Sequence, residues 1–313
     1  MKKLKNFAVI GGGSWGTALA CLVARVYGSA LIYTPEVNIV DEINNHHKNS
    51  KYLDDTVLPS GITATASLLD VASYDAIILA VPSHAFEIVI QELKQMGLSS
   101  KTVLLIATKG MCQEPLQLFS TKMEQEFDNP YAFISGPNFA KEVAIGNFAS
   151  ITITSKDQPL ARYIADELSS EQLDVSVSTD IITVQFAWIV MNIIAIKSGI
   201  LMAQGYGENA RAWLVSKGLE EIAVISRALG GAQESLNLPA VIGYLVLKSY
   251  STTSRNTKFG YEFHQNNYSK EFLANYPVLV EGASAAKLLH GFVSKYNLDL
   301  PMTSSVAKLV LYS

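Results

Sequence analysis

The chain begins with an apolar run that ends in a cluster of glycines, FAVIGGGSWGT at residues 7–17. Gly11, Gly13 and Gly16 have the G-x-G-x-x-G spacing, and a helical pattern follows them. In a strand–turn–helix unit the first glycine makes a tight turn, the second lets the backbone approach a pyrophosphate, and the third allows close packing. Glycines also serve ordinary turns, but this position directly after a predicted strand favours a dinucleotide-binding site.

The rest of the first half alternates short β-branched runs with helical patterns. The runs ALIYT, DAIILAVP, TVLLIAT and YAFIS are expected to form strands, and helices are expected between them, one of them at 115–127. This strict alternation predicts right-handed βαβ units and a parallel sheet.

From about residue 183 long helical patterns replace the alternation. They occupy 183–200, 208–230 and 283–295, and the polar stretch 249–260 is expected to be the main loop of this half. We therefore predict a doubly wound Rossmann-type domain at residues 1–182 and a helical substrate-binding domain at residues 183–313.

The composition restricts the kind of partner. With 24 Lys and Arg against 28 Asp and Glu, the net charge is −4, so nothing indicates a nucleic-acid partner. Cys21 and Cys112 match no metal-binding spacing, so we expect no metal site and a reducing compartment. The basic N-terminus is followed by too short an apolar run for a signal sequence. We expect a cytoplasmic protein.

The most apolar segment, FAWIVMNIIAI at residues 186–196, contains one amide, Asn192. A membrane span would need about 18 residues, and a stretch of that length here contains both Asn192 and Lys197. We therefore expect a buried helix of a soluble protein. A buried amide without a partner costs roughly 1–3 kcal/mol, so Asn192 is either paired within the fold or retained for a ligand.

Glu36 stands at the end of the second predicted strand, about 20 residues after Gly16, where dinucleotide-binding domains place a carboxylate on the ribose 2′-hydroxyl of NAD. No arginine stands at this strand end to hold the 2′-phosphate of NADP. NAD is therefore favoured over NADP as the cofactor. The alternative is that Glu36 only opens a helix with Pro35.

Eight motifs carry a resemblance to a known family. They are GGGSWGTALA (11–20), KYL (51–53), AVPSHAF (80–86), ATKGM (107–111), SGPNFAKEV (135–143), GENARA (207–212), SRNTKFG (254–260) and VEG (280–282). In this order and spacing they resemble the bacterial glycerol-3-phosphate dehydrogenases, which interconvert sn-glycerol 3-phosphate and dihydroxyacetone phosphate with NAD(P) and supply phospholipid synthesis. The resemblance implies a dinucleotide domain, a helical domain, a substrate cleft between them and a possible homodimer.

The resemblance also implies roles for single residues. Those implied at the cofactor are Ser14, Trp15, Lys109, Ala140, Arg255 and Glu281, and those implied at the substrate are Lys109, Gly136, Asn138, Asn192, Ser254, Arg255 and Asn256. The guanidinium of Arg255 is a rigid fork suited to a phosphate dianion. By residue type alone Lys109 would be a solvated loop cation and Arg255 a surface residue. For Lys109, a position at the carboxyl end of a parallel sheet favours ligand binding.

Three positions depart from the family pattern. The resemblance implies a catalytic lysine where this chain has Met191, an aspartate at Tyr244 and a threonine at Lys248. Methionine carries no exchangeable proton and is typical core filler. One hypothesis is that Tyr244 and Lys248, four residues apart on one helix face, supply a replacement acid and cation for weak reduction.

Two other hypotheses stay open. The chain could be a homologue that binds dinucleotide without chemistry, or a reductase of similar shape that acts on a hydroxy acid. Against a hydroxy-acid substrate, the retained SRN of residues 254–256 still favours a phosphate-bearing one.

Overall fold

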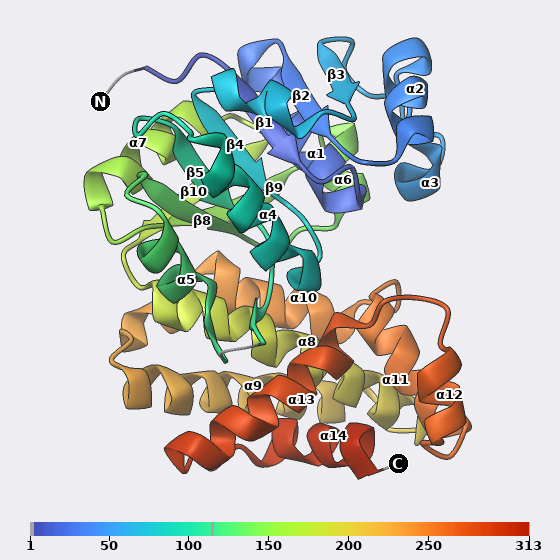
Figure 1. Cartoon of the computed structure of the whole chain (residues 1–313). Helices are drawn as coiled ribbons and strands as arrows, with labels where there is room; N and C mark the ends of the chain where they lie inside the picture. The colour runs from blue at the N-terminus through green and yellow to red at the C-terminus, as the bar shows by residue number, and fades with distance from the viewer. Residues whose placement is uncertain (1–2, 114–115, 313) are drawn as a thin grey trace. The chain divides into compact units, whose positions relative to one another are not determined.

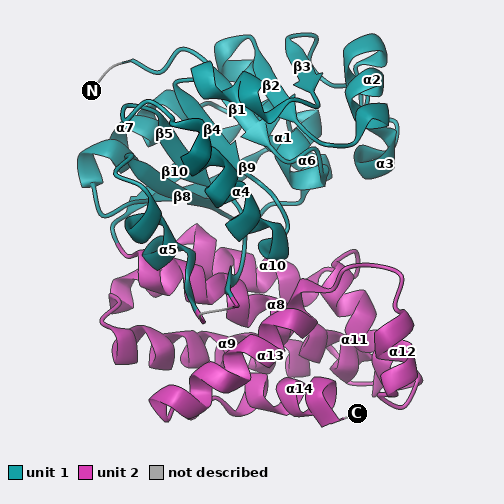
Figure 2. Ribbon diagram, in the orientation of Figure 1, with its two compact units in different colours: residues 1–112, 117–179 teal, residues 113–116, 180–313 magenta. Residues whose placement is uncertain are grey.

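The computed structural model describes residues 3–113 and 116–312 and shows two compact units, coloured separately in Figure 2. Unit 1 comprises residues 1–112 and 117–179, and unit 2 comprises residues 113–116 and 180–313. The division along the chain falls a few residues before position 183. In addition, a short segment from within the first half belongs to the helical unit, which no local pattern indicated.

Unit 1 is built on an eight-stranded sheet in the order β10-β9-β8-β5-β4-β1-β2-β3. Every neighbouring pair of strands is parallel except β8 with β9. The strands are β1 (Phe7–Ile10), β2 (Ala30–Tyr33), β3 (Ile62–Thr65), β4 (Ala76–Leu79), β5 (Val103–Ile106), β8 (Tyr131–Ser135), β9 (Ala149–Thr154) and β10 (Leu173–Ser178). The Rossmann-type sheet predicted from the sequence is confirmed.

Three strands of this sheet were not predicted. The sequences of β3, β9 and β10 are ITAT, ASITIT and LDVSVS, in which hydroxyl residues replace much of the apolar run. Both β3 and β10 are edge strands, where one side of the strand has no neighbour and polar residues are tolerated. Their signal is therefore weaker than that of the central strands, which are buried along their whole length.

The helices of unit 1 are shown in Figure 1. They are α1 (Ser14–Tyr27), α2 (Val37–His46), α3 (Ser50–Leu53), α4 (Ser83–Met96), α5 (Phe119–Glu126), α6 (Ala140–Ile145) and α7 (Gln158–Leu168), with a 3-10 turn at Leu68–Ser73 and a small hairpin of β6 (Met111–Cys112) and β7 (Gln117–Leu118). The helix expected over 115–127 begins only at Phe119, after β7, and Pro115 lies outside the described residues.

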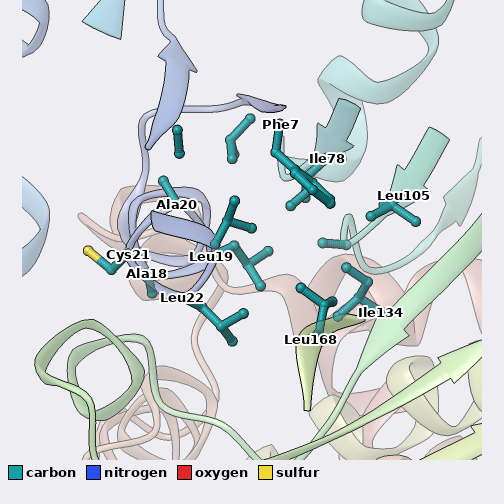
Figure 3. Packing of buried hydrophobic residues seen from close by; sticks show 14 of the residues in the cluster. Phe7, Ala18, Leu19, Ala20, Cys21, Leu22, Ile78, Leu105, Ile134 and Leu168 are labelled. Atoms are coloured by element: carbon teal, nitrogen blue, oxygen red, sulfur yellow. The ribbon is translucent and has the colours of Figure 1, made fainter. Parts of the chain in front are cut away.

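The core of unit 1 lies between the sheet and the helices that cover it. Figure 3 shows Leu19 of α1 and Leu168 of α7 with Ile78, Leu105 and Ile134 of the central strands, all buried. This apolar layer holds the start of α1 close to the end of β1, so the glycine turn between them is set by the packing of the whole unit.

All secondary-structure elements of unit 2 are helices or helical turns over its described residues. Its elements are α8 (Ile181–Ala203), α9 (Glu208–Leu229), a 3-10 turn (Gln233–Asn237), a π-helical turn (Pro239–Gly243), α10 (Tyr244–Tyr250), α11 (Arg255–Gln265), α12 (Lys270–Asn275), α13 (Glu281–Tyr296) and α14 (Pro301–Tyr312). Helix α8 packs against α9, α10, α11, α13 and α14. It is the one helix among the described residues long and apolar enough to cross a membrane, but 83% of its most apolar window is buried inside the protein, as in the core helix of a soluble protein.

The prediction of a long polar loop at 249–260 is wrong. Only residues 251–254 separate α10 from α11, and the stretch from Arg255 onward is helical. Helix α11 crosses α8 so closely that a Cβ on Gly260 would lie 2.0 Å from the carbonyl oxygen of Ile196. Its polar residues Asn256 and Thr257 are buried in this contact. Tertiary packing thus overrides a composition typical of loops.

Candidate functional site

The glycine turn between β1 and α1 has the shape that the spacing predicted. Gly11 has a φ of +123°, and a Cβ there would lie 2.4 Å from the carbonyl oxygen of Ala80. A Cβ on Gly16 would lie 1.9 Å from the carbonyl oxygen of Gly11, whereas one on Gly13 would meet nothing within 4 Å. Two of the glycines are therefore needed for the turn itself, and the middle one leaves open space beside the backbone.

The start of α1 is suited to a phosphate group. Gly13 is the residue before the helix, and no side chain caps the helix there. Amide groups at a helix start and the helix dipole together attract anions. The observations at Gly13 show that the turn fits the pyrophosphate of a dinucleotide.

A residue that the sequence analysis missed holds this turn in place. The buried Asn49, which precedes α3, donates from Nδ2 to the carbonyl oxygen of Gly12 and to Oγ1 of Thr17, both at 2.8 Å. The contact spans more than 30 residues, so no local pattern could have indicated it. Asn49 ties α3 to the glycine turn.

Trp15 and Lys109 lie together in unit 1. The Lys109 ammonium is 5.4 Å from the centre of the Trp15 ring system, a cation–π arrangement, and Lys109 follows β5 at the carboxyl end of the sheet. The indole nitrogen of Trp15 is buried and has no hydrogen-bond partner within residues 3–113 and 116–312. Two residues implied at the cofactor are thus in contact.

The SGPNF segment follows β8. A Cβ on Gly136 would lie 2.1 Å from the carbonyl oxygen of Ser150, so the chain passes close to β9 there. Asn138 donates from Nδ2 to the same carbonyl oxygen at 3.0 Å, and its Oδ1 is buried without a partner in the described part of the chain. An acceptor of this kind suits a ligand hydroxyl. Ala140 begins helix α6 two residues later.

Glu36 precedes α2 but does not cap it with its side chain. Its carboxylate forms an ion pair with Lys51 and accepts a 2.9 Å hydrogen bond from the hydroxyl of Tyr52. The Lys51 contact lowers the pKa of Glu36 below the usual 4.5. The carboxylate at the end of β2 is therefore ionised and partnered by two residues of the KYL motif.

In unit 2, Asn192 is paired within the fold. It donates from Nδ2 to the carbonyl oxygen of Trp188 at 3.0 Å and accepts at Oδ1 from Nδ2 of Asn256 at 2.8 Å. Asn256 in turn accepts from the backbone amide of Gly282 at 3.0 Å. Two predicted substrate residues thus form a buried chain that joins α8, α11 and α13. Met191 beside them is 1% exposed and packed in the core.

Three predicted ligand residues lie at helix starts of unit 2. Ser254 is buried and caps α11 by accepting from the amide of Thr257, and Arg255 is the exposed first residue of that helix. Glu281 is the first residue of α13, where the helix dipole favours a carboxylate.

Tyr244 and Lys248 meet on α10. The Tyr244 side chain is 1% exposed, and the Lys248 ammonium lies 5.4 Å from its ring centre. Burial raises the pKa of Tyr244 above the ordinary 10, while the charge and hydrogen bond of Lys248 and the charge of Arg255 act in the lowering direction. The charge of Glu281 adds to the increase. The phenol therefore lies within electrostatic reach of three charged residues that the sequence analysis singled out.

A cavity in unit 2 lies apart from the predicted site residues. This cavity of about 450 Å³ lies between α12 and the start of α13, with Lys270, Tyr276 and Val280 in its wall, and none of the predicted site residues line it. Across the described residues, no three His, Cys, Asp or Glu side chains form a group that could hold a metal ion.

Comparison with known proteins agrees with this geometry. Residues 6–161 match the family model of the NAD-dependent glycerol-3-phosphate dehydrogenase N-terminus, and residues 180–312 match that of its C-terminus. The chain belongs to the NAD-dependent glycerol-3-phosphate dehydrogenase family. This confirms the resemblance carried by the eight motifs. The members of the family are oxidoreductases that use NAD(P).

Individual glycerol-3-phosphate dehydrogenases are similar over the full length. The [NAD(P)+] enzyme of Rickettsia bellii (strain OSU 85-389) is 45% identical, covering 99% of this chain and 100% of the relative. That of Rickettsia prowazekii (strain Madrid E) is 44% identical with the same coverage. The crystal structure of glycerol-3-phosphate dehydrogenase from Coxiella burnetii has a TM-score of 0.91 at 30% identity, covering 99% of this chain and 95% of that one.

A more distant likeness concerns the fold alone. The ketopantoate reductase from Ralstonia eutropha JMP134 has a TM-score of 0.60 at 15% identity, covering 97% of each chain. The two-unit architecture is therefore shared with reductases outside the glycerol-3-phosphate dehydrogenase family.

Proposed function

We propose that this chain interconverts dihydroxyacetone phosphate and sn-glycerol 3-phosphate with NAD(P), and that Tyr244 and Lys248 perform the proton transfer which the family resemblance assigns to a lysine at position 191. The observation that carries this proposal is the buried Tyr244 phenol beside the Lys248 ammonium, within electrostatic reach of Arg255. Full-length similarity to glycerol-3-phosphate dehydrogenases supports the substrate class.

Binding of the substrate and transfer of the proton would fall to different residues. Arg255 would bind the substrate phosphate, and the buried acceptor of Asn138 would receive a substrate hydroxyl. A dinucleotide held at the turn of Gly11, Gly13 and Gly16 would supply the hydride in reduction and accept it in oxidation. Tyr244 gives its proton to the ketone oxygen in reduction and receives one from the hydroxyl in oxidation. The Lys248 ammonium stabilises the phenolate that remains after reduction.

The competing proposal is a homologue that binds the cofactor without turnover. Two observations favour it: Met191 is packed in the core, and the amide of Asn192 is occupied by Trp188 and Asn256. Loss of a positioned acid or base typically lowers the rate by about 10²–10⁴.

The deciding measurement is NADH oxidation with dihydroxyacetone phosphate as substrate. If Tyr244 and Lys248 act as proposed, Tyr244→Phe and Lys248→Thr each lower kcat by about 10² or more. Tyr250→Phe is the matched control, because Tyr250 lies on the same helix but donates to the carbonyl oxygen of Glu208.

Three other results of these turnover measurements would each contradict part of the proposal. Unchanged turnover in both variants overturns the role of Tyr244 and Lys248. If the chain binds the cofactor without turnover, and the combined substitutions Met191→Lys, Tyr244→Asp and Lys248→Thr restore turnover, the chain is an inactive homologue. A chain that reduces a hydroxy-acid precursor but not dihydroxyacetone phosphate overturns the substrate.

The same proposal extends to the cofactor and the setting of the reaction. Glu36 at the end of β2 supports a preference for NAD, because its carboxylate can accept from a ribose hydroxyl. We also propose a cytoplasmic homodimer that supplies phospholipid synthesis, as the family resemblance implies. Light scattering of the purified chain tests the dimer, and a mass of one chain overturns it.

A further inference from the structure

A charged cluster lies at the end of β2, and of its residues only Glu36 has a role in the function proposed above. Glu36, Lys51 and Tyr52 form it, with Lys51 paired to the carboxylate and the Tyr52 hydroxyl donating to Oε1 of Glu36 at 2.9 Å. The side chain of Lys51 is 52% exposed and that of Glu36 is 32% exposed. Both charges are therefore accessible to a ligand.

The cluster is fixed relative to the glycine turn. Asn49 holds the start of α3 to Gly12 through the 2.8 Å bond from its Nδ2, and Lys51 lies in the same short helix. Gly12 also touches the end of β2, because a Cβ there would lie 2.7 Å from the Cβ of Thr34. The turn, the strand end and α3 are thus joined through buried contacts within unit 1.

The position of the Glu36–Lys51 pair at the end of β2 indicates which part of a dinucleotide it would contact. In Rossmann-type domains the end of the second strand faces the adenosine ribose, whose 2′ position is a hydroxyl in NAD and a phosphate in NADP. A carboxylate alone accepts from the hydroxyl but repels the phosphate. A lysine ammonium at the same place attracts the phosphate.

We propose that Lys51 is a selectivity residue that allows NADP to bind where Glu36 favours NAD. An exposed ion pair is weak, so either partner can exchange its contact for one with the ribose or its phosphate. With NAD, Glu36 accepts from the 2′-hydroxyl. With NADP, Lys51 turns to the 2′-phosphate and offsets the repulsion from Glu36. This inference rests on the proposed use of NAD(P) by this chain.

The test compares equilibrium binding of NADH and NADPH to the full chain by calorimetry, without turnover. Lys51→Met should weaken NADPH by about five- to tenfold and change NADH by less than about twofold. Lys51→Arg should keep NADPH binding, and Glu36→Gln should strengthen NADPH while weakening NADH. Lys48→Met is the matched control, because Lys48 lies one residue before Asn49 and pairs with Asp55 instead.

The outcomes separate this inference from the function on which it rests. If Lys51→Met weakens both cofactors equally, weakens neither, or behaves like Lys48→Met, the role of Lys51 is wrong whatever the catalytic rate. If the binding shifts occur but no variant or wild-type chain turns over, Lys51 keeps its role and the proposed catalysis fails. If the chain binds neither dinucleotide, both fail.

Discussion

At the scale of single residues, Gly13 and Gly16 have different tasks in one turn. Gly16 is needed by the fold, since a Cβ there would overlap the carbonyl oxygen of Gly11 at 1.9 Å, whereas Gly13 faces open space. We expect Gly16→Ala to cost about 1–3 kcal/mol of stability. Gly13→Ala should leave the melting temperature unchanged but weaken NADH binding by about tenfold or more, because the methyl group takes the place of the pyrophosphate.

Thermal melting and calorimetric titration of the two variants check this prediction. Gly97→Ala is a control for melting, because Gly97 ends α4 at a φ of +66° with nothing within 4 Å of its Cβ position. It should cost stability through backbone strain alone and leave NADH binding intact. Full NADH affinity in Gly13→Ala would show that the cofactor does not lie on this turn.

The acid role of Tyr244 predicts the direction of a pH effect. Burial raises the pKa of the phenol above 10, so the proton needed for reduction is present at neutral pH and the rate falls only in the alkaline range. Lys248 lowers that pKa, since its positive charge stabilises the phenolate. Lys248→Met should therefore move the alkaline fall in reduction, and the alkaline rise in oxidation, to higher pH.

Profiles of kcat against pH in both directions measure this shift. The control is Lys258→Met, which removes an exposed cation of α11 that pairs with Glu262. A shift to lower pH in Lys248→Met, or an equal shift in the control, would contradict the pairing of Lys248 with the catalytic phenol.

At the scale of elements, helices α8 and α11 cross with their backbones in close contact. Gly199 of α8 and Gly260 of α11 both lie where a Cβ would meet a backbone oxygen, at 1.9 Å and 2.0 Å respectively. Backbone atoms cannot move aside as a side chain can, so we expect Gly260→Ala to destabilise the protein by about 3 kcal/mol. It should also impair catalysis, because Asn256 and Arg255 belong to the same helix.

Chemical denaturation compares this variant with Gly291→Ala on α13. Gly291 is exposed and its nearest neighbour to an added Cβ is 4.0 Å away, so alanine there should stabilise the helix by up to about 1 kcal/mol. Equal effects at the two glycines would mean that helix propensity, and not the α8–α11 contact, governs both.

The same crossing explains which elements the sequence could not indicate. The polar stretch STTSRNTK at residues 251–258 is typical of a loop, yet its second half begins α11, and Asn256 and Thr257 of that half are buried. In contrast, α8 was evident from its apolar length, and the central strands from their continuous β-branched runs. Elements with a strong local pattern are predictable, and those stabilised by a neighbour are not.

At the scale of the whole molecule, the cofactor should stabilise the unit that holds the glycine turn. A ligand present at 100 times its Kd adds about 2.7 kcal/mol to the free energy of unfolding of the state that binds it. Calorimetric scans with NADH should therefore raise the transition of unit 1, and Gly13→Ala should abolish the increase. No increase in the wild-type chain at this concentration would contradict cofactor binding by unit 1.

The sequence by itself determined the glycine turn, the alternating strands and helices and the family, because these depend on the spacing of residues close together in the chain. Only the tertiary structure decided which side chains meet. Asn192, which had no evident partner, pairs with Asn256 across 64 positions, and Glu36 pairs with Lys51 in place of capping a helix. Tyr244 and Lys248 share a helix, but burial by the surrounding helices sets the pKa of the phenol. Such contacts follow from the packing of whole elements, which no local spacing contains.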